Sequence, residues 1–291
     1  MAKYSIRDLE NLSGVKAHTI RIWEKRYNLV EPMRTSTNIR YYCDKDLKKL
    51  LNISILNKNG FKISEIANLN KEELNDKVIH LINEAKDYDS RIESLIVAMI
   101  ELDELKFEKI LNQTIIKFGF EKTITDTIYP FLERIGVLWQ IGNVNPAQEH
   151  FISNLIRQKL IVAIDGLLQS DKNSTKQVIL FLPEGELHEI SLLVYHYFLK
   201  KKGYKIIYLG QSVPFEDLIE VERIKPITFL FTIITTKYSN INVEDYFKKL
   251  SNQFKSKTIF IAGKQVNKSI KNIPSNIKII NSPSHFFNYI H

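Results

Sequence analysis

The stretch LPEGELHEIS, residues 182–191, contains a carboxylate and an imidazole at a spacing that suits metal binding. Glu186 and His188 are separated by a single residue, so the carboxylate is close enough to orient the histidine ring. Carboxylates orient metal-bound histidines in this way in many proteins. The stretch follows an apolar run that ends at Pro183. We therefore expect His188 at the carboxyl edge of a sheet, where ligands bind, rather than in a core.

A second stretch, VLWQIGNVNPAQEHF at residues 137–151, groups residue types that are rare in this chain. Trp139 is one of two tryptophans, and nine residues separate it from Glu149 and His150. One interpretation is an ordinary helix end, with the tryptophan in a core and the glutamate near a helix N-terminus, where its charge favours the helix dipole. The other is a lid over a large flat ligand.

Composition limits the class of protein. Hydrophobic residues make up 44% and charged residues 25%, which is typical of a globular protein. Cys43 is the one cysteine, which excludes an internal disulfide, and we expect a cytoplasmic protein. No apolar run approaches the length of a membrane span, so no membrane partner is expected. The net charge is +8, and residues 1–70 account for +6 of it, which places an anionic partner near the N-terminus.

The hydrophobic pattern changes twice along the chain, which predicts three domains. Residues 1–75 have short helical segments with tight turns and a small hairpin or loop. Residues 76–172 have a helical period almost throughout, and a last helix beginning near Pro146, which predicts a four-helix bundle. Residues 173–291 alternate short β-branched runs with helical segments. This order predicts an α/β domain with a doubly wound parallel sheet of the flavodoxin-like or Rossmann-like kind. Its strands are predicted at QVILFLP, KIIYLG, ITFLFTII, TIFIAG and IKIIN.

The N-terminal region has the layout of a helix-turn-helix. Its second helix carries His18, Thr19, Arg21, Lys25 and Arg26. A helix of this kind fits the major groove, where arginine reads guanine and other basic groups hold phosphates. The alternative is a small helical domain with a solvated basic face.

The residues here resemble the MerR family of winged helix-turn-helix proteins over about 65 residues. SGV with TIRIWEKR is similar to the family's turn and recognition helix, and P-x-R followed by RYY is similar to its wing. The resemblance implies that His18, Thr19 and Arg21 face double-stranded promoter DNA from the helix, with Arg40 and Tyr41 on the wing. Arg26 is a further DNA-binding candidate, while Trp23 is expected in the core.

The remaining domains resemble the cobalamin-binding module of methionine synthase and corrinoid proteins. That family's D/E-x-H-x-x-G motif implies that His188 is the lower cobalt ligand and that Glu186 orients it. Thr232 to Ile234 stands at the family's Ser-x-Leu segment, and Ala262-Gly263 at its Gly-Gly. W-x9-E-H resembles the bundle signature of light-sensing, cobalamin-dependent MerR-type regulators. It implies that Trp139, Glu149 and His150 cover the upper face of the corrin.

Together these resemblances imply a non-enzymatic transcriptional repressor that binds promoter DNA as a dimer or tetramer. Adenosylcobalamin is the expected cofactor, and its state, changed by light or otherwise, would set DNA affinity. Three residues depart from the family: Ser191 replaces the motif's glycine, Ala262 a second glycine, and Gln140 follows the tryptophan where light sensors often have histidine. These departures favour an alternative, a regulator that has lost cobalamin and acts through protein contacts. A corrinoid methyl carrier is the third hypothesis, but it gives no reason for TIRIWEKR.

Overall fold

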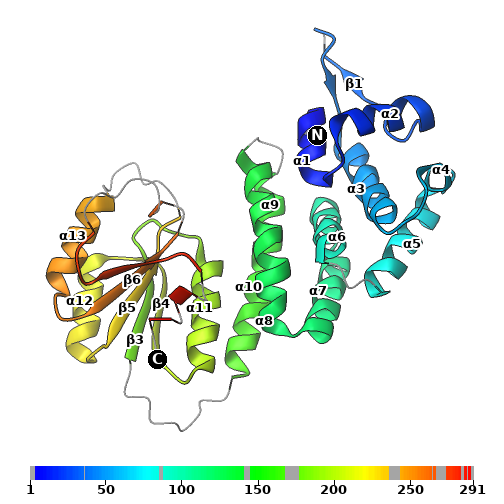
Figure 1. Cartoon of the computed structure of the whole chain (residues 1–291). Helices are drawn as coiled ribbons and strands as arrows, with labels where there is room; N and C mark the ends of the chain where they lie inside the picture. Colours follow the sequence, from blue (N-terminus) through cyan, green and yellow to red (C-terminus); the bar gives the residue numbers. More distant parts are fainter. Residues whose placement is uncertain are drawn as a thin grey trace. The chain divides into compact units, whose positions relative to one another are not determined.

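The chain folds into two compact units, and each is described by itself. Figure 1 shows the computed structural model, which describes residues 4–35, 37–84, 88–140, 145–167, 177–235, 243–263, 265–266, 273–282, 285–286 and 288–289. At residues 79, 80, 82–84, 88 and 137–140 it describes the backbone alone. Unit 1 is Met1–Leu155 and unit 2 is Ile156–His291. The described helices include none that is long and apolar enough to cross a membrane.

Local signals define the first helices of unit 1. Helix α1 (Ile6–Ser13) begins at a capping box, in which the Ser5 hydroxyl accepts from the Asp8 N–H and the Asp8 carboxylate accepts from the Ser5 N–H. It ends at Gly14, whose φ of 70° is the left-handed conformation that favours glycine at a helix end. Helix α2 (Ala17–Tyr27) follows at once, so the predicted helix-turn-helix is present.

A hairpin follows α2, where the sequence predicts a loop or hairpin. Strands β1 (Met33–Arg34) and β2 (Arg40–Tyr41) pair antiparallel. Beside them, Tyr42 pairs with Tyr4 through two backbone hydrogen bonds of 2.9 Å. The hairpin is thereby attached to the start of α1.

The rest of unit 1 is helical. Its elements are α3 (Asp44–Lys58), α4 (Ile63–Ile66), α5 (Lys71–Glu84), α6 (Tyr88–Glu101), α7 (Glu104–Phe118), α8 (Phe120–Thr123), the π-helix η1 (Ile124–Ile128), α9 (Tyr129–Gln140) and the first half of α10 (Pro146–Asp165). Helix α10 begins at Pro146, as predicted from its suitability for a first turn. The division into three domains at residues 75 and 172 stays a prediction.

Helix α6 lies at the centre of unit 1 and is buried on nearly all sides from Ser90 to Met99. It carries the fully buried carboxylate Glu93, whose Oε1 accepts a 2.6 Å hydrogen bond from Lys58 Nζ of α3. Burial raises the pKa of Glu93 to about 7, although the Lys58 ammonium lowers it. The cost of desolvating the carboxylate thus exceeds the benefit of its ion pair.

We expect the stability of unit 1 to fall as the pH rises from 5 to 8. The pKa of Glu93 is higher in the folded state than in the unfolded chain, so its contribution is fully present below about pH 4.5 and is lost through about pH 7. Glu93→Gln removes this dependence. The change that it causes in the free energy of unfolding should therefore be about 2–3 kcal/mol more favourable at pH 8 than at pH 5. Both tryptophans lie in unit 1, so tryptophan fluorescence in urea measures the change. If the free energies of unfolding of the wild type and of Glu93→Gln changed in parallel with pH, the raised pKa of Glu93 would be contradicted.

Unit 2 is built on a parallel sheet of five strands, as the alternating pattern predicts. The strands are β3 (Gln177–Pro183), β4 (Lys205–Val213), β5 (Phe229–Ile233), β6 (Thr258–Ala262) and β7 (Ile277–Ile280), in the spatial order β4-β3-β5-β6-β7. The described helices between them are α11 (Glu189–Lys201), α12 (Phe215–Ile224) and α13 (Val243–Gln253). The sheet and the preceding helices confirm the predicted fold class.

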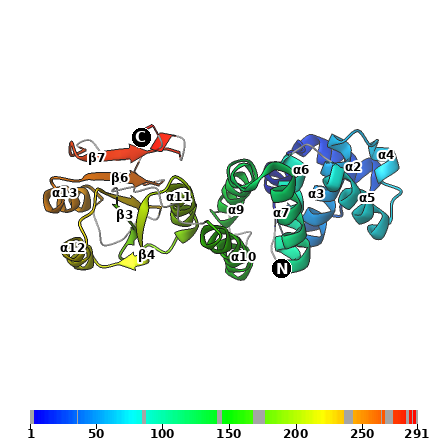
Figure 2. The ribbon, with the colours of Figure 1, turned by 90° about the horizontal axis from the view of Figure 1, so that it is seen from below.

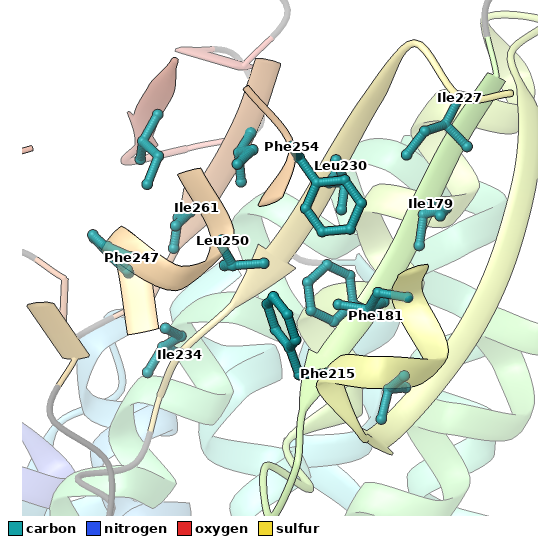
Figure 3. Packing of buried hydrophobic residues seen from close by; sticks show 14 of the residues in the cluster. Ile179, Phe181, Phe215, Ile227, Leu230, Ile234, Phe247, Leu250, Phe254 and Ile261 are labelled. Atoms are coloured by element: carbon teal, nitrogen blue, oxygen red, sulfur yellow. The ribbon is translucent and has the colours of Figure 1, made fainter. Parts of the chain in front are cut away.

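Apolar clusters cover both faces of this sheet. Helices α12 and α13 lie on one face and α11 on the other (Figure 2). On the first face, Phe215, Phe247 and Phe254 pack onto strand residues such as Ile179 and Leu230 (Figure 3). On the second, α11 packs through Leu192, Tyr195 and Leu199. Because both faces are covered, the strands are near-continuous apolar runs rather than alternating ones.

The strand order creates a topological switch point at one particular edge of the sheet. Strand β3 has β4 on one side and β5 on the other, so the connection that leaves β3 toward β4 and the connection that leaves β5 toward β6 run in opposite directions. In open α/β sheets, ligands bind outside the carboxyl ends of strands at such a switch point. The segments that follow β3 and β5 therefore form the expected ligand edge.

Candidate functional site

The loop after β3 is held at the switch point by one buried carboxylate. Glu186 is fully buried, and its Oε1 accepts from the N–H groups of Leu187 (3.1 Å) and His188 (3.2 Å). Its Oε2 accepts from the N–H of Thr235, 2.7 Å away in the segment after β5. One side chain thus joins the segments that follow β3 and β5.

His188 lies beside this carboxylate, as its spacing predicts. Its Nδ1 is 2.6 Å from Glu186 Oε1, and 53% of its side chain is exposed. The residue is the N-cap of α11, so its backbone belongs to the turn that begins the helix. With Nδ1 engaged by a carboxylate, Nε2 is the ring nitrogen that would ligate a metal, and the carboxylate would raise its basicity.

The next residue, Glu189, is the centre of a second polar network. Its Oε2 accepts from Arg157 Nε of α10 at 2.7 Å, and its Oε1 accepts from Tyr208 OH of β4 at 2.8 Å. Gln211 Nε2 donates both to Glu189 Oε2 (3.2 Å) and to the carbonyl of Leu187 (3.0 Å). Burial, then the neighbouring Glu189 carboxylate, raises the pKa of Tyr208, so its hydroxyl stays a donor.

Three further predicted residues lie on separate elements of unit 2. Ser191 is half-buried in the first turn of α11, and Thr232 is fully buried on β5. Gly263 follows β6 with a φ of 116°, and a Cβ there would lie 2.1 Å from the carbonyl oxygen of Ile234. Only glycine permits this approach of the two segments.

Two observations show that unit 2 fits a cobalt-containing group. The His188 imidazole is a good cobalt ligand and has its orienting carboxylate in place. The buried hydroxyl of Thr232 has no hydrogen-bond partner within the described part of the chain, and such a group normally has one. No cluster of three or more His, Cys, Asp or Glu that could hold a metal ion is found among the described residues.

The bundle residues are placed only in part. Trp139 is in the last turn of α9, and its side chain lies outside what the structure describes. Glu149 is half-buried in the first turn of α10 and accepts from Ser153 Oγ at 3.3 Å, while His150 is exposed. The role of these three residues stays a prediction, as does that of Gln140, whose side chain is also outside the described set.

The helix-turn-helix residues face solvent as their proposed role requires. His18, Arg21 and Arg26 are exposed on α2, and Thr19 is half-buried. Trp23 packs into the core with 7% exposure, as expected. The basic side chains therefore form one face of α2 that is open to a partner.

The wing approaches this helix through an ion pair. Arg40 is exposed, with its Nε 3.5 Å from Glu24 Oε1 of α2, and Tyr41 beside it is half-buried. Glu24 also accepts from Tyr42 OH at 3.2 Å, so it ties the wing to the helix. A hollow of about 440 Å³ lies here, lined by Arg21, Glu24, Lys25, Asn28, Val30, Glu31, Pro32 and Arg40.

We expect Arg21→Ala to weaken binding to a generic DNA duplex by about threefold to tenfold near 0.1 M salt. Each phosphate contact contributes about 0.9 to the slope of log K against log salt, so the slope should shrink by about that amount. Fluorescence anisotropy of a labelled duplex at several salt concentrations measures both. Lys109→Ala, an exposed change of the same charge on α7, is the control. An unchanged slope for Arg21→Ala would remove this residue from the DNA interface.

Several of these site residues are not evident from the sequence. The Thr235 N–H, after β5, donates to Glu186, and Arg157 of α10 pairs with Glu189, the residue after His188. The one available signal is that Thr235 is a polar residue just after an apolar strand, and Glu189 directly follows the histidine. The pairing of Arg157 with Glu189 spans 32 positions and has no local signature.

Comparison with known proteins agrees with this arrangement. Residues 4–73 match the MerR HTH family of regulatory proteins, and residues 91–163 match the B12 binding domain. The chain is 29% identical over 222 residues to the HTH-type transcriptional repressor CarH of Myxococcus xanthus, covering 74% of this chain and 73% of CarH. It is also 29% identical over 212 residues to CarA of the same organism, covering 72% and 68%.

The fold has a solved counterpart. The monomethylamine corrinoid protein of Methanosarcina barkeri superposes with a TM-score of 0.56 and 16% identity, over 74% of this chain and 97% of that protein. At this identity the likeness concerns the fold alone. The sequence matches, in contrast, cover both the DNA-binding segment and the helices that follow it. The chain thus joins a segment that matches the MerR HTH family to one that matches the B12 binding domain, and these matches support a DNA-binding regulator similar to CarH and CarA.

Proposed function

We propose that this chain is a DNA-binding transcriptional repressor whose affinity for promoter DNA is set by adenosylcobalamin. The observation that carries the proposal is the buried Glu186 carboxylate, which holds the His188 ring 2.6 Å away at the switch point of the sheet. The relatives CarH and CarA are transcriptional repressors, which supports a regulator rather than an enzyme.

The residues of unit 2 would share the work of holding the cofactor. His188 would ligate cobalt through Nε2, and Glu186 would fix the ring and its tautomer. Thr232 would donate its buried hydroxyl, while Gly263 and Ser191 would line the surface of contact. Adenosylcobalamin supplies a cobalt–carbon bond that light can break. From the bundle, Trp139, Glu149 and His150 would contact the corrin.

DNA binding would be assigned to unit 1. His18, Thr19, Arg21 and Arg26 on α2 would enter the major groove, and Arg40 and Tyr41 on the wing would contact the backbone. A cofactor changes DNA affinity only if it binds two states of the protein with different affinities. We propose that these states differ in oligomeric form, a dimer or tetramer being the DNA-binding one.

The first experiment is a visible absorption spectrum. Purified protein is mixed with adenosylcobalamin in the dark, desalted, measured, and then illuminated. We expect corrin bands that the protein retains, that His188→Ala loses or shifts, and that light alters. Anisotropy of a duplex from the promoter of its own gene then compares DNA affinity in the two states.

The outcomes separate the hypotheses. A folded protein that retains no corrin would overturn cobalamin binding and favour a regulator that acts through protein contacts, for which Ser191 and Ala262 are the sequence arguments. Bound cobalamin with no light response would leave a cofactor sensor and remove light as its signal, in line with Gln140. Bound cobalamin with no salt-dependent DNA binding would favour a methyl carrier.

A further inference from the structure

Glu189, the residue after the proposed cobalt ligand His188, contacts two other elements, α10 and β4. It follows His188 directly, its side chain is 8% exposed, and it is the first residue of α11. A carboxylate in this position already interacts favourably with the helix dipole. Its contacts with α10 and β4 are therefore additional to its role in starting the helix.

The contacts with β4 fix the residues on either side of His188 to the end of that strand. Tyr208 donates to Glu189 Oε1, and Gln211 bridges Glu189 Oε2 and the Leu187 carbonyl. Gly210, between them, has a φ of 79°, and a Cβ there would be 3.5 Å from Glu189 Oε1. The residues on both sides of His188 are thus fixed to the same strand end.

On the helix side, Glu189 forms a 2.7 Å ion pair with Arg157 Nε, and only the arginine is substantially exposed. A charge-assisted hydrogen bond with one largely buried partner is stronger than a surface ion pair. Further along, Lys200 Nζ of α11 donates to the carbonyl of Ile164 in α10 at 2.7 Å. Among the described residues, both contacts attach the second half of α10 to α11, and the Arg157 contact is the one beside His188.

Helix α10 also carries two of the bundle residues assigned to the cofactor, Glu149 and His150. It is continuous from Pro146 to Asp165. His150 and Arg157 are seven residues apart, which is about two helical turns and places them on one face. We propose that Glu189 is a positioning residue for His188, and that its ion pair with Arg157 communicates cobalamin binding to helix α10. This inference rests on the proposed function.

The test uses the full chain with adenosylcobalamin in the dark. Hydrogen exchange is measured for the amides of residues 157–165, the half of α10 beyond Glu149 and His150, with and without the cofactor in the wild type, Arg157→Met and Lys200→Met. We expect cobalamin to slow exchange in wild-type α10 by about fivefold or more, in the range of ordinary coupling between sites. Arg157→Met should bind cobalamin and lose most of this gain. Lys200→Met, which removes the other attachment, should keep it.

Absorption spectra test the positioning role. Glu189→Ala should lower the fraction of cobalt that has a nitrogen ligand below it, and Glu189→Gln should restore that fraction, because the amide still accepts from Tyr208. The double variant Arg157→Met with Glu189→Gln should lose no more α10 protection than either single variant, since both remove one interaction.

The possible failures are distinguishable. A wild type that binds no adenosylcobalamin would overturn the proposed function, and this inference with it, at the first spectrum. Normal binding with equal α10 protection in the wild type and Arg157→Met would overturn the coupling alone. If Lys200→Met lost as much protection of α10 as Arg157→Met, the coupling would also be overturned, because the effect would then reflect a general destabilisation of α10. A Glu189→Ala spectrum like that of the wild type would overturn the positioning role.

Discussion

Replacing Glu186 with alanine should weaken adenosylcobalamin binding by about 10–100-fold, which is the usual effect of losing the group that orients a metal-bound histidine. The carboxylate accepts from three backbone N–H groups and contacts the His188 ring, so its loss frees both the loop after β3 and the segment after β5. Titration of the purified variant with the cofactor, followed by its absorption, measures the change.

Glu184→Ala is the matched control, because this glutamate belongs to the same loop and is exposed. It should bind the cofactor within about twofold of the wild type, as surface changes generally have small effects. Far-ultraviolet circular dichroism verifies that both variants are folded. Equal affinities for Glu186→Ala and the wild type would mean that the carboxylate does not orient a cobalt ligand.

We also expect Gly263→Ala to destabilise unit 2 by about 3 kcal/mol or more. A Cβ at this position would lie 2.1 Å from the carbonyl oxygen of Ile234, and a φ of 116° is strained for any residue with a side chain. The clash is with backbone, so no side-chain rotation relieves it. The segments after β5 and β6 must separate, which also disturbs the Thr235 N–H that holds Glu186.

Gly60→Ala separates the strain of a positive φ from the clash. Gly60 has a φ of 92° and no atom within 4 Å of an added Cβ, so its replacement should cost only about 1–2 kcal/mol. Urea unfolding followed by circular dichroism compares the two variants with the wild type. Similar losses in both would show that the approach of Gly263 to Ile234 does not limit stability.

Much of the fold follows from patterns of short range. The capping box at Ser5 and Asp8 and the left-handed Gly14 define the first helix and its turn, and both are local. The five apolar β-branched runs in 173–291 became five parallel strands because each run is too short for a helix and helical segments separate them. Trp23 is buried as its apolar position in α2 implies.

The candidate sites followed from the sequence only where the partners are neighbours in the chain. Glu186 and His188, two positions apart, are in contact as their spacing predicts, since a turn of that length leaves few alternatives. The wing motif predicts that Arg40 contacts DNA. It does not predict the contact of Arg40 with Glu24, because sixteen positions separate the two residues. Whether Trp139, Glu149 and His150 share a ligand with His188 stays a prediction.

Tertiary structure alone decided the contacts that give the site its rigidity. The Thr235 N–H reaches Glu186 across 49 positions because β5 is placed beside β3, and strand order depends on how the whole sheet packs. Arg157 reaches Glu189, and Lys200 reaches the carbonyl of Ile164, because the tertiary structure brings the second half of α10 near α11. The raised pKa of Glu93 likewise depends on how completely the surrounding helices exclude water. The sequence determines local conformation and candidate residues, whereas burial and long-range pairing arise from packing, in which every element constrains the others.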